Sequence, residues 1–359
     1  MKLKTQFDLV RTLDRATRRR TLYGSSGDCS IKVIGDEEDR AVIVFDTSIS
    51  SQVLTSKNFQ NSNYFKAGLE HLASGGKSVE LIDQFYENIP LFKEGDEHRQ
   101  LKKEFNVILE EANYELENKE RIIGDYFRKR KDRIVSPVEF ADKFTRVCSA
   151  LVIAKLTNFS LLRIMRALDM RCNIFCVHFH PARQLAMNTT LEYLYQDRNI
   201  PGREETDHVS HLVAQAFIAM GIDPVSGAIC ANLIEDNKSK FVEHTHRYRP
   251  TSFVPRECVA ETEIAGVNFM VGDTVYVYLV PTESELTVDG SASGTSAHDI
   301  GFGKGVHTCI GKQLSIGIIN LAERLVAELY PNGFSHKADI EPDGVFLAFS
   351  DSKSACVPA

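Results

Sequence analysis

Hydrophobic and polar residues alternate with different periods along this chain, and the changes of period divide it into extended and helical stretches. Two short runs of branched apolar residues, 31–34 and 41–45, flank a polar turn at 35–39, which predicts a β-hairpin. Residues 49–55 shift to helical spacing soon after it. Two later runs are also predicted as strands, 263–267 and 274–278.

The middle of the chain follows the helical period of three and four residues. The stretch 97–133 is rich in Glu, Lys and Leu at that spacing, which predicts a helix. Ser136 to Glu139 form a capping box with proline at the first helical position, so a new helix is expected from there toward Leu156. Three later stretches are assigned in the same way: helices over 205–234 and 240–247, and a polar surface loop over 284–297.

Composition adds the broad class of the protein. The 359 residues are 43% hydrophobic and 25% charged, which is typical of a soluble globular protein. No repeat or linker divides the chain, so we expect an N-terminal segment, 1–28, and one mainly α domain with a minor β portion, 29–359. The formal net charge of −7, with no basic stripe, argues against nucleic-acid binding.

Cysteine usage and apolar runs bear on location. The eight cysteines are scattered without a disulfide framework, which indicates a reducing cytoplasm. No apolar segment follows the arginines at 18–20, so no export signal is expected. The longest apolar run, 212–234, approaches the length of a membrane span, but Asp223 and Pro224 interrupt it. We therefore expect a buried helix and no membrane partner.

The stretch 302–311 carries the clearest chemical signal. Cys309 lies there in a glycine-rich loop, and a helical pattern follows at once. A cysteine ligand to haem iron needs a thiolate, a backbone that approaches the porphyrin closely, and positive potential at the sulfur. Gly303 and Gly305 permit a tight left-handed backbone. The amides of the helix that begins after Gly311 favour a negatively charged sulfur.

This loop resembles the cysteine-ligand loop of the cytochrome P-450 family of haem-thiolate monooxygenases. The family pattern is F-x-x-G-x-[H/R]-x-C-x-G, and its fixed positions are occupied here by Phe302, Gly305, His307, Cys309 and Gly311. The resemblance implies a cytochrome P-450-like, single large helical domain that binds haem b. It implies Cys309 as the axial ligand of the iron, His307 as a donor to a haem propionate, and Phe302, Gly303 and Gly311 as further cofactor-binding residues.

Three more propionate partners follow from the resemblance. His98 and Lys102 align with the family's H-x-x-x-R helix, where lysine replaces the arginine and the i, i+4 spacing puts both on one face. Lysine keeps the charge of arginine but loses its planar fork. Arg256 matches the arginine that precedes the family's following β-hairpin.

The segment 219–225 resembles the family's oxygen-activating helix, [A/G]-G-x-[D/E]-T-[T/S/V]. Gly221 and Asp223 fall in place, but Pro224 replaces the threonine that helps to deliver protons to oxygen in the family. Proline supplies no hydroxyl and no N–H, and it is expected to kink the helix. Two interpretations stand: Asp223 carries protons through water, or it caps the break of a plain proline kink. These three residues are the candidate catalytic set.

Two other patterns depart from the family or compete with it. The family's E-x-x-R ion pair lacks its glutamate, and Glu243 with Arg247, at i, i+4, is expected to replace that pair. Cys176, His178 and His180 alternate as metal ligands on one face of a strand would, although the same alternation fits an ordinary buried stretch.

The resemblance implies an oxidoreductase, a monooxygenase that inserts one oxygen atom from O2 into a small organic substrate, with the thiolate assisting O–O cleavage. Electrons are expected from a ferredoxin and reductase partner that docks near four basic residues, Arg99, Lys103, Lys304 and Lys312. The missing threonine leaves two alternatives. One is a haem-thiolate enzyme that uses peroxide or catalyses a non-oxidative rearrangement or dehydration; the other is a non-catalytic haem-binding protein.

Overall fold

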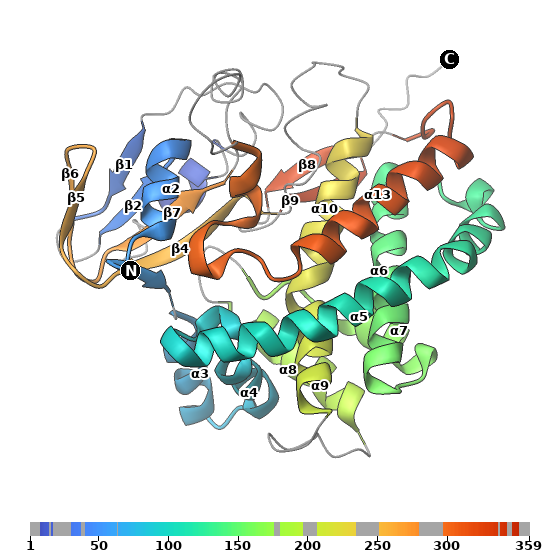
Figure 1. The fold of residues 1–359 in the computed structure, drawn as a ribbon, viewed down its shortest axis with the longest axis horizontal. Helices are drawn as coiled ribbons and strands as arrows, with labels where there is room; N and C mark the ends of the chain where they lie inside the picture. Colours follow the sequence, from blue (N-terminus) through green and yellow to red (C-terminus); the bar gives the residue numbers. More distant parts are fainter. Residues whose placement is uncertain are drawn as a thin grey trace. The chain divides into compact units, whose positions relative to one another are not determined.

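The computed structural model describes residues 8–13, 16, 30–36, 40–62, 64–175, 180–196, 207–234, 251–279, 297–336, 338–342 and 347–351. The chain divides into two compact units. The first comprises Met1–Ser62, Ile234–Cys309 and Ile340–Phe349, and the second comprises Asn63–Leu233, Ile310–Asp339 and Ser350–Ala359. Figure 1 shows a sheet with few helices in the first unit and a helical array in the second. The predicted class, mainly α with a minor β portion, is confirmed.

A five-stranded sheet forms the framework of the first unit. Its strand order is β1-β2-β7-β4-β3. The bounds are Ile31–Ile34 for β1, Ala41–Val44 for β2, Phe59–Asn61 for β3, Phe253–Cys258 for β4 and Thr274–Tyr278 for β7. β1 and β2 pair antiparallel, β2 and β7 pair parallel, and β4 pairs antiparallel with both β7 and β3. The predicted hairpin and the predicted strand 274–278 are therefore confirmed.

The predicted strand 263–267 is wrong, because the chain reverses within it. Strand β5 (Thr262–Ile264) and strand β6 (Val267–Phe269) form a separate antiparallel hairpin. The reversal uses Ala265 at φ 53° and Gly266 at φ 76°. Two consecutive residues with positive φ are the signature of a tight type I′ turn, whose twist matches that of the flanking strands. Alanine at the first position hid the turn from the sequence pattern.

Helix α2 (Thr47–Thr55) packs on this sheet within the first unit. It begins at Asp46, whose carboxylate accepts a hydrogen bond from the Ile49 amide at 2.9 Å. The buried side chains of α2 join those of the strands in one hydrophobic cluster, made of Val42, Val44, Ile49, Val53, Leu54, Phe59, Cys258, Phe269, Val275, Val277, Leu279 and Ile300. This cluster fixes the C-terminal end of α2, against which the cysteine loop lies.

Helices make up most of the second unit. In chain order they are α3 (Tyr64–Ser74), α4 (Glu80–Asn88), the 3-10 turn η1 (Pro90–Phe92), α5 (Gly95–Arg128), the 3-10 turn η2 (Lys131–Arg133), α6 (Pro137–Thr157), α7 (Leu161–Met170), α8 (Pro181–Tyr195), α9 (His208–Ala216), the π-helical turn η3 (Phe217–Gly221), α10 (Ile222–Leu233) and α13 (Lys312–Leu329). Strands β8 (Ala338–Pro342) and β9 (Leu347–Asp351) form a further two-stranded sheet.

The capping box at the start of α6 is confirmed. Ser136 accepts a hydrogen bond from the Glu139 amide at 3.1 Å, and Glu139 accepts one from the Val135 amide at 3.1 Å. Each side chain therefore satisfies a backbone donor, as a capping box requires, although the second bond reaches one residue farther back than usual. Proline at the first position needs no partner for its nitrogen. Helix α6 then ends at Asn158 in the left-handed conformation, φ 55°.

Helices α5 and α13 run side by side in the same direction (Figure 1). Arg324 donates to Glu120 at 2.9 Å, and Arg128 donates to Glu328 at 2.7 Å near the C-terminal ends. The long helix predicted over 97–133 is confirmed as α5, except that the last residues form the short turn η2. The helix predicted over 240–247 and most of the surface loop predicted over 284–297 lie outside the described residues.

The apolar stretch His208–Leu233 is long and hydrophobic enough to cross a membrane, with a mean hydropathy of 1.5. Its most apolar window is 67% buried inside the protein, as in the core helices of soluble proteins. This agrees with the expectation of a buried helix. The predicted boundary at 28/29 stays a prediction, because residues 17–29 lie outside the described part of the chain.

Candidate functional site

The cysteine loop is a closed turn between two 3-10 segments, η5 (Ala297–Phe302) and η6 (Gly305–His307). The Cys309 amide donates to the Phe302 carbonyl at 2.8 Å, which joins the two ends of the loop. Phe302 is buried, with 3% of its surface exposed, whereas Cys309 is exposed. The loop is therefore anchored by its phenylalanine and presents its thiol outward.

Two glycines let this loop pass close to α2. Gly303 and Gly305 have φ of 76° and 75°, as their predicted left-handed conformation requires. A Cβ atom on Gly305 would lie 2.9 Å from the Leu54 carbonyl oxygen, nearer than side chains approach backbone atoms. A Cβ on Gly303 would meet nothing nearer than 3.6 Å. Position 305 thus requires glycine both for its backbone conformation and for the lack of space for a side chain. Position 303 requires glycine for its conformation alone.

Gly311 begins the helix that follows the thiol. It is the N-cap residue of α13, with φ −81°, so left-handed backbone is not the reason for glycine here. Its carbonyl accepts the Ser315 amide at 2.9 Å as the first bond of the helix. This 18-residue helix itself begins at Lys312, three positions after Cys309. The expected effect of its N-terminal amides on the thiol stays a prediction.

Arg256 and His307 are the cationic candidates of the first unit. Arg256 lies on β4, opposite Asn61 of β3 and Val275 of β7, and is 5% exposed. Its guanidinium donates to the Pro255 carbonyl at 2.9 Å. His307 is half-buried at the end of η6, inside the cysteine loop. A buried arginine and a loop histidine are donors suited to a carboxylate ligand.

His98 and Lys102 lie one turn apart near the start of α5. His98 is 4% exposed, and its Nδ1 contacts the Pro90 carbonyl at 2.9 Å. A carbonyl oxygen only accepts, so Nδ1 must carry the hydrogen, and Nε2 can then donate only in the imidazolium form. Lys102 is half-buried on the same side of the helix. The predicted shared face is therefore present.

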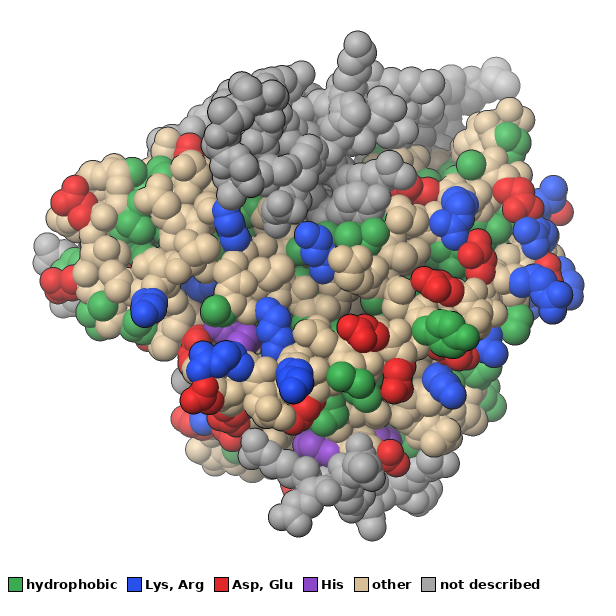
Figure 2. Space-filling model, viewed as in Figure 1, with side chains coloured by type: hydrophobic (Ala, Val, Ile, Leu, Met, Phe, Trp, Pro, Cys, Tyr) green, Lys and Arg blue, Asp and Glu red, His purple; other side chains and the backbone are tan. Residues whose placement is uncertain are grey.

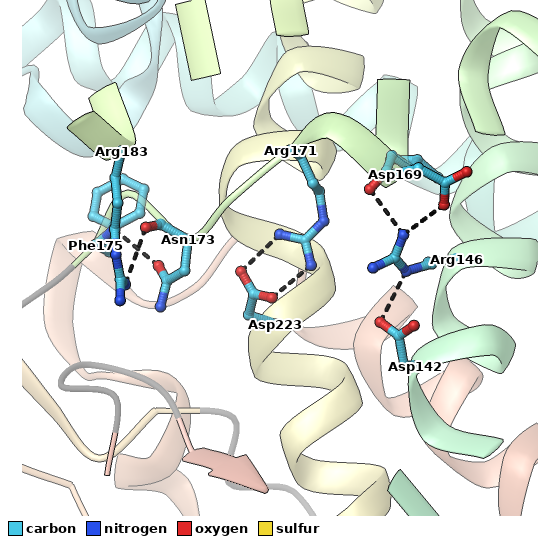
Figure 3. A network of polar contacts seen from close by, with 9 residues as sticks. Asp142, Arg146, Asp169, Arg171, Asn173, Phe175, Arg183 and Asp223 are labelled. Atoms are coloured by element: carbon cyan, nitrogen blue, oxygen red, sulfur yellow. Dashed lines mark hydrogen bonds and ion pairs between the residues drawn. The ribbon is translucent and has the colours of Figure 1, made fainter. Parts of the chain in front are cut away.

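Asp223 is held by a residue that the sequence did not reveal. Arg171, just after α7, donates to both carboxylate oxygens, at 2.7 Å and 2.5 Å (Figure 3). The exposed side-chain fractions are 5% for Arg171 and 26% for Asp223. Burial lowers the pKa of Arg171, but the hydrogen bonds and charge of Asp223 outweigh it and raise that pKa above its ordinary value. The carboxylate is thus bound in a side-chain ion pair.

The segment that carries Arg171 is fixed at both ends (Figure 3). Arg146 of α6 donates to the Leu168 carbonyl and to Asp169, each at 2.9 Å, near the end of α7. Arg183 of α8 donates to the Asn173 carbonyl at 3.3 Å. Three elements of the second unit therefore set the position of the guanidinium that meets Asp223.

Gly221 and Pro224 mark a change of helix type, which is where the proline kink was expected. Residues Phe217–Gly221 form one π-helical turn, and α-helix resumes at Ile222. Pro224 has no N–H for the carbonyl four residues earlier, and its ring crowds that carbonyl. A π turn widens the helix and accommodates this mismatch. A Cβ on Gly221 would lie 3.3 Å from the Phe217 ring, so the wide turn is also closely packed.

Several predicted residues lie outside the described part of the chain. They are Glu243 and Arg247 of the expected ion pair, and Cys176 and His178 of the metal hypothesis. Among the described residues, no group of three or more His, Cys, Asp or Glu side chains could hold a metal ion. Both hypotheses stay predictions.

The chemistry of these residues fits a haem group. The first unit offers an exposed thiol in a closed loop, together with a buried arginine and a histidine. The second offers a histidine and a lysine one turn apart. Haem of this class needs a thiolate that ligates the iron and cationic donors that bind its two propionates.

Comparison with known proteins identifies the fold. P450BioI, solved in complex with a hexadec-9Z-enoic acid ligated acyl carrier protein, aligns with a TM-score of 0.67 and 13% identity over 97% of this chain and 98% of its own. CYP109B1 from Bacillus subtilis gives a TM-score of 0.63 and 14% identity, with coverage of 96% and 97%. RauA, complexed with a biosynthetic intermediate of aurachin RE, gives 0.60 and 14%, covering 98% of both chains. No family model matches the sequence, and no curated protein matches it either.

Proposed function

We propose that this chain, whose fold is that of the cytochromes P-450, is a haem-thiolate oxidoreductase, a monooxygenase that inserts one oxygen atom from O2 into a small organic substrate. The observation that carries the proposal is the cysteine loop. Its thiol is exposed, its ends are joined by the bond from Cys309 to Phe302, and a helix begins three positions after Cys309. Such a loop supports an ionised sulfur and a planar ligand against it.

Each candidate residue has a separate role in holding haem b. Cys309 is the axial ligand of the iron. Arg256, His307, His98 and Lys102 are proposed to bind the propionates. When bound, haem with a thiolate ligand supplies O2 binding and O–O cleavage.

Asp223 is the proposed proton-carrying group of the π turn, because Pro224 has no hydroxyl to offer. Each of its oxygens accepts one hydrogen bond from Arg171 and keeps a further lone pair, so water can hydrogen-bond to the carboxylate while the ion pair is closed. Asp223 is 26% exposed, which leaves a path to solvent for that water. Arg171 then acts as a positioning residue that holds the carboxylate between transfers.

A second candidate function is favoured by the same pair of residues. The threonine is replaced by Pro224, and the remaining acid is bound to Arg171, so this helix delivers protons less readily than one with a hydroxyl. An enzyme that uses peroxide, or that catalyses a non-oxidative rearrangement or dehydration, needs fewer protons from this turn. Turnover with peroxide but none with O2 and a reductase would support this alternative.

The neighbours' substrates guide the choice of ligands to test. P450BioI was solved with an acyl chain on a carrier protein, and RauA with a biosynthetic intermediate. We propose a small organic substrate from secondary metabolism, and a ferredoxin and reductase as electron donors. Of the residues expected at the donor surface, Arg99 is already paired with Asp96, so Lys103 contributes more of the unpaired charge on α5. A cytoplasmic location stays a prediction.

The test is the carbon monoxide difference spectrum of the dithionite-reduced protein. The proposal predicts the strongly red-shifted Soret band of thiolate ligation in the wild type and its loss in Cys309→Ser. Cys172→Ser is the matched control, because Cys172 is half-buried and belongs to the other unit. An unshifted band in the wild type, a red-shifted band that survives Cys309→Ser, or a protein that takes up no haem would contradict the proposal.

A further inference from the structure

A small cavity opens among α3, α4 and η1 of the second unit, and we propose that it binds a primary ammonium group carried on a short apolar stem. Six residues line this α3–α4 cavity: Lys66, Asp83, Tyr86, Glu87, Phe92 and Lys93. Its volume is about 170 Å³, close to the roughly 150 Å³ of an engineered cavity that holds benzene. A ligand of about six to eight heavy atoms therefore fits. None of the lining residues is among those proposed to hold haem.

Aromatic rings form the inner wall of the α3–α4 cavity, and charged side chains form its rim. Tyr86 is buried and Phe92 is half-buried, and their ring centroids are 5.2 Å apart. Lys66 and Glu87 are both about half exposed. Figure 2 shows acidic and basic side chains close together over α3, α4 and the start of α5. A ligand in the cavity therefore contacts the rings with its apolar part and the rim with its polar group.

The fixed charges around the cavity favour a cation. Lys66 donates to Glu87 at 2.8 Å, and Lys93 pairs with Glu97 at 3.0 Å, so each lysine is already compensated by a carboxylate. For the carboxylate of Asp83, by contrast, no hydrogen bond or ion pair is found among the residues that the structure describes. The cavity therefore keeps a negative charge without a counter-ion, which attracts a positively charged ligand.

The surroundings of Asp83 raise the free energy of its charged form. Burial raises the pKa of this half-buried carboxyl above its ordinary value, and the negative charges of Glu87 and Glu70 raise it further, although Lys66 opposes them. An ammonium group beside Asp83 stabilises the ionised form and reverses part of this shift. The affinity for the ligand should therefore fall as the pH is lowered and Asp83 takes up a proton.

Lys66 shows the binding mode that is expected of the ligand. Its ammonium lies at the rim and donates to a carboxylate of α4, and this hydrogen bond to Glu87 raises the pKa of Lys66. Glu87 and Asp83 are four residues apart, so both carboxylates lie on one face of α4. The ammonium of a ligand would bind the second of these carboxylates in the same way, with its stem against Tyr86 and Phe92.

Isothermal titration calorimetry with benzylammonium tests the proposal, and benzyl alcohol is the matched neutral ligand of nearly the same shape. We expect a Kd of about 0.1 to 1 mM for benzylammonium, because one partly exposed ion pair and one small ring supply the affinity. Benzyl alcohol should bind about tenfold more weakly or worse, and Asp83→Asn should weaken benzylammonium binding by a similar factor. Glu80→Gln is the matched control, because Glu80 is exposed on the same helix outside the cavity and its loss removes the same charge.

Three results would overturn the proposal: no heat of binding up to about ten times that Kd, equal affinity for the alcohol and the ammonium, or binding that Asp83→Asn leaves as strong as Glu80→Gln does. If haem is bound as proposed, an amine that ligates its iron shifts the Soret band and still binds after Asp83→Asn, so the two sites are distinguished. Unchanged thermal unfolding of both variants, expected for residues at the surface, excludes misfolding as the cause.

Discussion

Gly305 is the residue where the cysteine loop is most sensitive to substitution. Its φ of 75° is strained for any side chain, and a Cβ would come within 2.9 Å of the Leu54 carbonyl. Gly333 has nearly the same φ, 77°, but a Cβ there would meet nothing within 4 Å. The two glycines therefore separate the effect of conformation from the effect of close approach.

We predict that Gly305→Ala lowers the free energy of unfolding more than Gly333→Ala does. The strain common to both costs about 1 kcal/mol, and the contact with Leu54 adds about 1 to 2 kcal/mol at Gly305 only. Chemical denaturation of both variants measures the difference. Equal losses would mean that the loop moves away from α2 without cost. If haem binds as proposed, only Gly305→Ala also lowers the haem-to-protein ratio.

The pair of Arg171 and Asp223 gives a second prediction at this scale. Arg171→Met leaves a carboxylate that is three-quarters buried and without its partner, and it should destabilise the protein by about 2 kcal/mol. Arg128→Met is the control, because Arg128 and Glu328 are 45% and 50% exposed and such pairs contribute below about 1 kcal/mol. Adding Asp223→Asn to Arg171→Met should recover part of the loss. A smaller loss for Arg171→Met than for Arg128→Met would contradict the assignment.

Features that depend on a local sequence pattern were predicted correctly. Contacts between residues far apart in the sequence were not predicted. The left-handed glycines were expected, because the loop is ten residues long and its needs are local. Arg171 was not expected, since 52 residues separate it from Asp223 and neither spacing nor residue type links the two. The role of Leu54 against Gly305 was hidden for the same reason.

Among the elements, the boundaries marked by capping side chains were predicted best. Ser136 with Glu139 located the start of α6 to the residue. The hairpin of β5 and β6 was missed, because Ala265 at positive φ gives no signal in the sequence. The π turn η3 was anticipated only as a break at Pro224. Proline reveals that a helix is disturbed, but surrounding packing decides how the disturbance is absorbed.

Helix α10 gives a prediction about that turn. Pro224→Thr restores an N–H that can bond to the carbonyl of Met220, and it should raise the free energy of unfolding by about 1 kcal/mol. This is less than the usual cost of an interior proline, because the π turn already absorbs part of the mismatch. Amide hydrogen exchange should slow over the turn as it becomes α-helical.

Pro224→Val is the matched control, because valine has the shape of threonine without the hydroxyl. Both variants should gain stability equally, whereas only the threonine should speed turnover with O2 if a proton-delivering hydroxyl is what this helix lacks. Loss of stability in both would show that the buried packing of Ile218 and Ala219 requires the wide turn.

For the whole molecule, a ten-residue motif predicted the fold of a chain of 359 residues. The solved cytochromes P-450 share only 13 to 14% of its residues and yet align over nearly the full length. The fold tolerates such divergence because most core positions need only an apolar side chain of suitable volume. Substrate and partners could not be predicted in this way, since they depend on side-chain positions that no pattern in one sequence determines.

The cysteines differ in burial, so their reactivity reports local opening of the structure. Cys309 is exposed, whereas Cys148 and Cys230 are buried and their desolvation raises the pKa of each thiol well above its ordinary value. An alkylating reagent therefore reaches the first in the native state and the other two only when their helices separate. Mass spectrometry of the labelled protein therefore reports two events in one sample. Label at Cys309 shows whether the cysteine loop is open to solvent, and label at Cys148 or Cys230 shows whether the helical core has loosened.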